Sequence, residues 1–206
     1  MNPPGTSPPK PSLQAARKAF ARAHISQAAR ELFYTEGYAE TTFDKIASAA
    51  GTRRTTLYSH FRDKAEILEQ IAEEYQSGLC KLVGALEGTP VPDREQIAAW
   101  VAVLVDFVER QRAPATLVIG LSIGQDTPHA IQRTSERFPK ALAERLPAFA
   151  KAWDGDEQHV HIKAWGKVVM RELSLACLEV ARGDAGSEHA LTVSTDLFTW
   201  FVRKFA

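Results

Sequence analysis

The stretch Thr41–Phe61, TTFDKIASAAGTRRTTLYSHF, decides the fold of this chain. It predicts two short helices joined by a tight turn. Ala47, Gly51 and Leu57 have the spacing of a helix-turn-helix, in which a small residue lets two helices cross and a glycine permits the turn. Apolar residues of the first helix recur at i, i+3, i+4 and i+7, which predicts one buried face: Phe43, Ile46, Ala47 and Ala50.

The second helix of this pair has a polar outer face. Leu57 and Phe61, four residues apart, predict its buried side. The residues left facing outward are Arg53 at its start, then Arg54, Thr55, Tyr58 and Ser59. A short helix that offers arginine, threonine and tyrosine near its N-terminus is suited to the major groove of DNA.

Charge is divided unevenly along the 206 residues. The net charge is zero, with 25 basic and 25 acidic residues, which argues against a general nucleic-acid binder. Residues 1–65, however, hold ten Lys and Arg against five Asp and Glu, whereas residues 66–206 hold fifteen against twenty. This asymmetry is expected if only the N-terminal part contacts phosphates.

The pattern AxxLFxxxGYxxTTFDKIAxxAGxxxxTLYxHFxxKxxIL, from Ala29 to Leu68, resembles the DNA-binding domain of the TetR family of one-component transcriptional regulators. The resemblance implies that Arg54 and Thr55 contact base edges, with Arg54 suited to a bidentate guanine contact. It implies phosphate contacts from Thr42, Thr56, Tyr58, His60 and Lys64. For Arg53 a base, a phosphate and solvent all remain open.

The chain departs from the family pattern between the two helices. The family usually has a small apolar residue and then a capping serine after the glycine, but here Thr52 and Arg53 follow Gly51. We expect Thr52 to take over the cap. Asp44 lies where some members carry a basic residue, so no phosphate contact is expected from it.

The rest of the chain predicts an all-α fold. Helical periodicity is found over residues 12–36, 63–86, 93–112, 114–125, 128–153, 156–182 and 187–205, with Pro139 and Pro147 expected to kink or split the fifth of these. We expect a disordered or basic N-terminal arm at 1–20, a three-helix DNA-binding domain at 21–66 and a larger C-terminal ligand-binding and dimerisation domain at 67–206. The helix over 63–86 belongs to both domains.

The C-terminal part has many aromatic residues, for which core packing and a ligand cavity are the alternatives. By resemblance it holds an effector pocket, with candidate lining residues Tyr75, Trp100, Phe107, His129, Phe138, Trp165 and Met170, and with Trp153 and His159 as further candidates. The last two helices are too apolar to stay exposed, and in the family such helices pair across a two-fold axis. The candidate interface residues are Leu173, Leu191, Phe198 and Phe201.

Other site patterns are weaker. Residues 120–124, GLSIG, match the G-x-S-x-G nucleophile elbow around Ser122, but that motif needs a strand before it, whereas this segment predicts a helix. His159 and His161 lie two apart, so on a helix they diverge and no metal site is expected. Cys80 and Cys177 are in no zinc-ligand pattern, and no cofactor is predicted.

These features predict a homodimeric DNA-binding repressor, not an enzyme, released from a palindromic operator by a small apolar or amphipathic effector. The alternatives are an effector-independent DNA-binding factor of the same fold and a Ser122 hydrolase. With no signal-peptide core and no apolar run long enough to cross a membrane, we expect a bacterial, cytoplasmic protein.

Overall fold

The computed structural model describes residues 12–86 and 88–206, and every regular element in these two ranges is a helix. The prediction of an all-α fold is therefore confirmed. Residues 1–11, the greater part of the predicted N-terminal arm, lie outside the described ranges, but residues 13–20 are the first turns of a helix.

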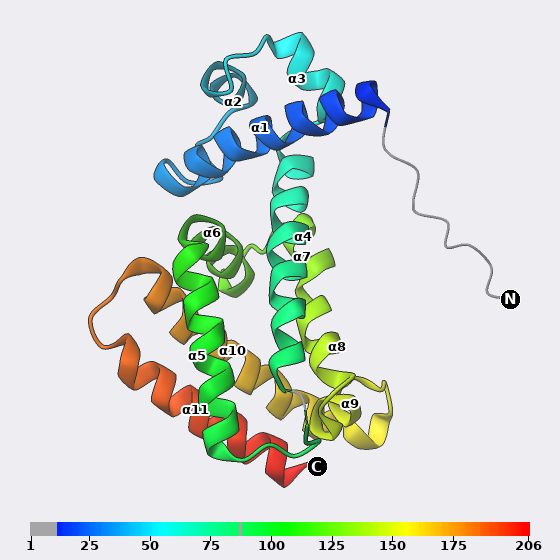
Figure 1. Ribbon diagram of the computed structural model, residues 1–206, viewed down its shortest axis with the longest axis vertical. Coiled ribbons are helices and arrows are strands. Elements are labelled where there is room, and N and C mark those ends of the chain that lie inside the picture. Colours follow the sequence, from blue (N-terminus) through cyan, green and yellow to red (C-terminus); the bar gives the residue numbers. More distant parts are fainter. Residues whose placement is uncertain (1–11, 87) are drawn as a thin grey trace, which may run out of the picture.

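Three helices form a small unit at one end of the elongated molecule, and we call them the head (Figure 1). They are α1 (Leu13–Thr35), α2 (Phe43–Ala49) and α3 (Arg54–His60). From the head, α4 (Lys64–Leu82) runs down into the larger unit, the body, and continues as a short 3₁₀ turn, η1 (Val83–Leu86). The boundary expected at residues 66 and 67 falls inside α4, so one continuous helix belongs to both units.

Local signals explain where the head helices begin and end. The Ser12 hydroxyl accepts from the Ala15 N–H at 3.2 Å and caps α1, and Thr42 accepts from the Lys45 N–H at 3.3 Å and caps α2. Gly51 has φ +59°, a left-handed conformation that L side chains rarely adopt, so the turn between α2 and α3 requires glycine. Leu57 and Phe61, predicted as the inner side of α3, are 0% and 1% exposed.

The body adds further helices to α4. They are α5 (Arg94–Arg110), α6 (Arg112–Ile123), α7 (His129–Ser135), α8 (Arg137–Ala143), α9 (Pro147–Trp153), η2 (Glu157–His159), α10 (Val160–Arg182) and α11 (Ser187–Lys204). Helices α5 to α8 pack against α4, and α9 to α11 pack against one another. The segment predicted as one kinked helix over 128–153 is three helices. It divides at Glu136, whereas Pro139 lies in the first turn of α8 and Pro147 begins α9, where a missing N–H costs nothing.

Aromatic side chains form the centre of the body. Phe149 lies against Phe198 and Phe201 with ring centroids 5.3 and 5.1 Å apart, and all three are fully buried. Trp100 stacks on Phe138 and donates its indole N–H to the Leu82 carbonyl oxygen at 3.1 Å. These contacts join α5, α8, α9 and α11 to the lower end of α4.

Over residues 12–86 and 88–206, no helix is long and apolar enough to cross a membrane.

Candidate functional site

The exposed face of α3 centres on Arg54, which neighbouring side chains hold in place. Its guanidinium donates to the Asp44 carboxylate of α2 at 2.7 Å and to the Tyr58 hydroxyl at 3.2 Å. The hydrogen bond to Tyr58 and the charge of Asp44 raise the pKa of Arg54, so it stays cationic. More than half of the Arg54 side chain remains exposed, at 57%. A guanidinium that neighbouring side chains already position, and that remains accessible, suits bidentate contact with a base edge.

The other predicted contact residues of the head surround Arg54. Thr42, Arg53, Thr55 and Thr56 are exposed. Tyr58 is half exposed. Its ring packs on Phe43 with 4.8 Å between the ring centroids, and this contact holds α3 against α2. The hydroxyls of Thr42 and Thr56 lie at the start of α2 and in α3, where short polar side chains are able to meet phosphate oxygens.

Lys64 has a different role from the one expected. Its ammonium group donates to the carbonyl oxygens of Tyr38, Ala39 and Thr41 at 2.8, 3.0 and 3.0 Å. An ammonium has three donors, and all three are used inside the protein. Lys64 therefore fixes the loop before α2, and the geometry contradicts its assignment to a phosphate.

The start of α3 also differs from expectation. Helix α3 begins at Arg54, with Arg53 at the cap position and no side-chain cap hydrogen bond. Thr52 does not cap the helix; its backbone N–H donates to the Ala47 carbonyl at 2.9 Å and so closes the preceding turn. Arg53, at the cap position directly before the helix, is exposed and accessible to DNA.

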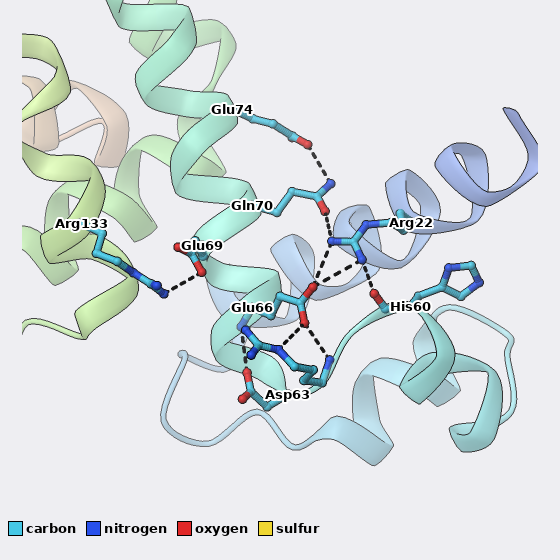
Figure 2. Close-up of polar contacts among 9 residues, drawn as sticks. Arg22, His60, Asp63, Glu66, Glu69, Gln70, Glu74 and Arg133 are labelled. Atoms are coloured by element: carbon cyan, nitrogen blue, oxygen red, sulfur yellow. Dashed lines mark hydrogen bonds and ion pairs between the residues drawn. The ribbon is translucent and has the colours of Figure 1, made fainter. Parts of the chain in front are cut away.

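A polar network joins the head to α4 (Figure 2). Arg22 of α1 donates to the His60 carbonyl oxygen, lies 3.4 Å from the Glu66 carboxylate and donates to Gln70 at 3.0 Å. Glu66 also accepts from the Arg62 backbone N–H at 2.8 Å, while its own backbone N–H donates to the Asp63 carboxylate at 2.8 Å and so caps α4. Arg22 is thus an internal link between α1, the end of α3 and α4.

On the other side of α4, one ion pair reaches the body. Glu69 accepts from Arg133 of α7 at 2.7 Å (Figure 2). Glu66 and Glu69, one turn apart, therefore connect the same helix to the head and to the body. The body also contains a cavity of about 600 Å³, one to three turns further along α4.

Residues from α4, α5, α6, α8, α9 and α10 line this cavity. Three of the residues predicted for a pocket are among them: Tyr75, Phe138 and Met170. Trp153, a further candidate, also lines it and packs so closely on α10 that a Cβ at position 166 would lie 2.7 Å from its ring. The wall is mainly apolar, and the volume suits a small molecule.

The other predicted pocket residues do not line the cavity. Trp100 is core, and Phe107 packs against Tyr75 at 5.5 Å and over Gly78. His129 is exposed at the start of α7. Trp165 is 43% exposed and packs on Trp200 of α11. The His159 Nδ1–H donates to the Asp154 carboxylate at 2.7 Å, and neither residue lines the cavity.

Polar cavity residues were missed from the sequence. Gln76, Ser122, Lys167, Arg171, Ser174 and Cys177 all contribute to the wall. The last four share the face of α10 that carries Met170, at three- and four-residue intervals, and that spacing was the available signal. Burial raises the pKa of Cys177 to about 12, so its thiol stays protonated.

The nucleophile-elbow motif has no elbow geometry. Gly120–Gly124 is the end of α6, and the Ser122 hydroxyl donates to the Ile119 carbonyl oxygen at 2.8 Å, as in an ordinary helix. The described parts of the chain contain no strand that could precede it. Over the same residues, no cluster of three or more His, Cys, Asp and Glu side chains has the arrangement of a metal site.

The residues predicted for a dimer interface are mostly internal. Phe198 and Phe201 are fully buried, Leu173 is 2% exposed and lines the cavity, and Leu191 is half-buried. This burial within one chain contradicts the prediction for Phe198, Phe201 and Leu173. The exposed apolar residues of α10 and α11 are instead Val160, Trp165, Val168, Val193 and Trp200.

The head is thus a helix-turn-helix with an exposed basic recognition helix, attached to a helical body with an internal cavity, as in bacterial one-component regulators. Residues 25–71 match the family described as bacterial regulatory proteins, tetR family. The chain is 33% identical over 100 residues to TtgW, an HTH-type transcriptional regulator of Pseudomonas putida, covering 48% of this chain and 69% of TtgW. This protein belongs to the TetR family.

Similarity to other relatives covers less of their length. FasR, an HTH-type transcriptional activator of Mycolicibacterium smegmatis, is 31% identical over 88 residues, which are 43% of this chain and 40% of FasR. The fold extends further than the sequence similarity. The Thermus thermophilus repressor FadR, solved in complex with lauroyl-CoA, has 22% identity and a TM-score of 0.57 over 90% of this chain and 95% of that chain.

Proposed function

We propose that the protein is a homodimeric repressor that binds a palindromic operator and is released by a small amphipathic effector. The observation that carries this proposal is the position of α4. Its first two turns hold α1 through Glu66 and Gln70, and its next two turns supply Tyr75, Gln76 and Leu79 to the cavity wall. A ligand that displaces the wall therefore acts on the helix that orients the head.

The coupling runs through two polar links that start one turn apart on α4. Arg22 ties α4 to the head, and Arg133 ties it to α7 at Glu69 (Figure 2). Helix α7 continues into α8, which carries the cavity residue Phe138. An effector that favours one position of α7 and α8 shifts α4 with them, and a coupling energy of ~1–3 kcal/mol is sufficient for regulation.

The proposed DNA surface uses the exposed side chains of α2 and α3. Arg54 contacts a guanine edge and Thr55 a neighbouring base, while Thr42, Thr56, Tyr58 and His60 meet phosphates. Arg53, the neighbour of Arg54 in the chain, serves a phosphate or a base. Residues 21–66 are the DNA-binding domain in this proposal, and residues 67–206 bind the effector and the second subunit.

The proposed interface is the exposed apolar side of α10 and α11. Trp165 and Trp200 pack together at 4.8 Å between ring centroids and remain 43% and 40% exposed. Val168 and Val193, exposed on the same two helices, extend this surface. Large apolar side chains of this kind on adjacent helices favour burial against a second copy, which would present two recognition helices ~34–36 Å apart.

The test starts from operator fragments selected from genomic DNA with the purified protein. Mobility-shift and reporter measurements on the selected fragments should give a palindromic sequence and lower transcription in the presence of the protein. Compounds that stabilise the protein against heat should then release the fragment. If no compound that binds the cavity alters DNA binding, the chain is an effector-independent DNA-binding factor. Transcription that rises with the protein would instead make it an activator.

A further inference from the structure

We infer that the cavity takes an amphipathic organic anion with a hydroxyl group at the end remote from its charge. The inference rests on the proposed function, because it names the class of effector. It comes from two groups of polar residues at different places in the mainly apolar wall of the cavity.

The inner group consists of Tyr75 and Gln76, adjacent residues of α4. Both line the cavity, and they are 4% and 9% exposed. Neither the Tyr75 hydroxyl nor the Gln76 side-chain oxygen has a hydrogen-bond partner within the described residues. A buried polar group without a partner is costly, so both atoms favour a ligand that supplies one.

One ligand hydroxyl satisfies both atoms. It accepts a hydrogen bond from the phenol of Tyr75 and donates its own proton to the oxygen of Gln76. Burial raises the pKa of Tyr75, so the phenol remains a neutral donor at physiological pH. A carbonyl would serve Tyr75 alone and would leave the Gln76 oxygen without a donor.

The outer group consists of Lys167 and Arg171, exposed residues one turn apart on α10. Within residues 12–86 and 88–206, neither lies at salt-bridge distance from a carboxylate, although both border the cavity. Glu136, the acidic residue at the same rim, is 3.3 Å from Lys140. The rim therefore offers two cations to an anionic group of the ligand.

The two groups are separated along one face of α10. Lys167 and Arg171 lie at the outer end, and the buried Cys177, which lines the inner part with Tyr75, lies at the other. Six to ten residues of helix correspond to ~9–15 Å. Leu79, Leu104, Val118, Phe138 and Met170 supply apolar wall to the same cavity. The ligand is thus an extended apolar chain with an anion at one end and a hydroxyl at the other.

The test uses three probes that differ only at their ends: ω-hydroxydecanoate, decanoate and decanediol. Calorimetry with the full-length protein should give ω-hydroxydecanoate an affinity about tenfold higher than that of decanoate, because decanoate leaves both inner groups unpaired. Decanediol should bind more weakly than ω-hydroxydecanoate, because it lacks the anion.

Variants assign each end. Tyr75→Phe removes only the hydroxyl, so it should reduce the preference for ω-hydroxydecanoate over decanoate to the part that Gln76 supplies, and keep the melting temperature of the free protein at or above the wild-type value. The double change Lys167→Gln and Arg171→Gln should lower the affinity for ω-hydroxydecanoate and for decanoate, and it should leave the affinity for decanediol unchanged. Lys163→Gln, on α10 but outside the cavity wall, is the matched control and should change none of the three affinities.

Equal binding of ω-hydroxydecanoate and decanoate to the wild type would overturn the inference, as would a preference that Tyr75→Phe leaves undiminished. Parallel mobility shifts separate it from the proposed function. Release of DNA by an unrelated compound, without binding of ω-hydroxydecanoate, overturns the inference alone. Binding with the expected preference but without DNA release supports the inference and overturns effector control.

Discussion

Particular polar side chains of the head and of the cavity differ in how they are satisfied. In the head, Lys64 donates to three backbone carbonyl oxygens and Thr42 caps α2, although the Ser26 hydroxyl and the His60 Nδ1 are buried without partners among the described residues. In the body, Tyr75 and Gln76 line a cavity without partners. The recognition surface is therefore preorganised before it meets DNA, whereas the cavity is suited to completion by a ligand. Helix α4 connects the recognition surface to the cavity.

The largest expected effect comes from breaking the head alone. Leu57→Ala removes a fully buried side chain beneath α3, and such truncations cost ~2–5 kcal/mol. DNA binding should be lost, while ligand binding in the body should stay within a few-fold of wild type. Mobility shifts and calorimetry on the same preparation check this. Equal loss of DNA binding and of ligand binding would show that the change disrupts the body together with the head.

The second effect concerns base selection. Arg54→Ala should remove ~1–3 kcal/mol of discrimination between the selected operator and a variant with one guanine changed, because the preset guanidinium is lost. Arg53→Ala is the matched control, and it should weaken both sequences similarly if Arg53 meets a phosphate. An unchanged operator preference in Arg54→Ala would show that α3 is not the base-contacting helix.

The sequence predicted the head far better than the cavity, for physical reasons. Head function depends on spacing within one stretch, so Gly51, Leu57 and the exposed Arg54 follow from the pattern. The family pattern could not show that Lys64 donates to the loop at residues 38–41. That contact depends on the tertiary packing that brings the start of α4 next to this loop.

The cavity depends on which of several apolar residues pack together. Trp100 and Phe138 look equivalent in the sequence, yet Trp100 is fully covered by other rings and Phe138 faces the cavity. The same ambiguity affected α11, where Phe201 is core and its neighbour Trp200 is exposed. Periodicity identifies a helix face, but a buried helix has two or more such faces, and only packing assigns them.

A third prediction tests whether Asp44 positions Arg54 before DNA binds. Asp44→Asn keeps the shape of the side chain but removes the charge that holds Arg54 at 2.7 Å. We expect a smaller loss of base discrimination than in Arg54→Ala, together with higher affinity for all DNA, since one negative charge leaves the surface. Mobility shifts at two salt concentrations check both results. A gain in affinity with full discrimination would mean that Arg54 needs no positioning by Asp44.

A fourth and smaller effect concerns the link from body to head. Arg133→Gln breaks an exposed pair with Glu69, whose side chains are 63% and 21% exposed, so little stability is at stake. Effector-induced release of DNA should nevertheless weaken by up to about fivefold, since ~0.2–1 kcal/mol of coupling is lost. Arg110→Gln, which breaks a pair within α5, is the control and should leave release unchanged. If the effector releases DNA equally well from both variants, the coupling does not depend on the pair of Arg133 and Glu69.

The smallest effect is a pH dependence on the head side of α4. The Arg62 backbone N–H, and then the Arg62 and Arg22 side chains, lower the pKa of Glu66 below its usual 4.5. A lowered pKa in the folded state stabilises the protein above the unfolded value, and that contribution disappears as pH falls through the lowered pKa. The free energy of unfolding of wild type should therefore exceed that of Glu66→Gln by up to about 1 kcal/mol near neutral pH. Denaturant titrations from neutral pH downward should show the difference shrinking below pH 4.5. Glu73→Gln, at an exposed position on the same helix, should show no such trend, and a constant difference for Glu66→Gln would mean that its charge does not contribute to the junction.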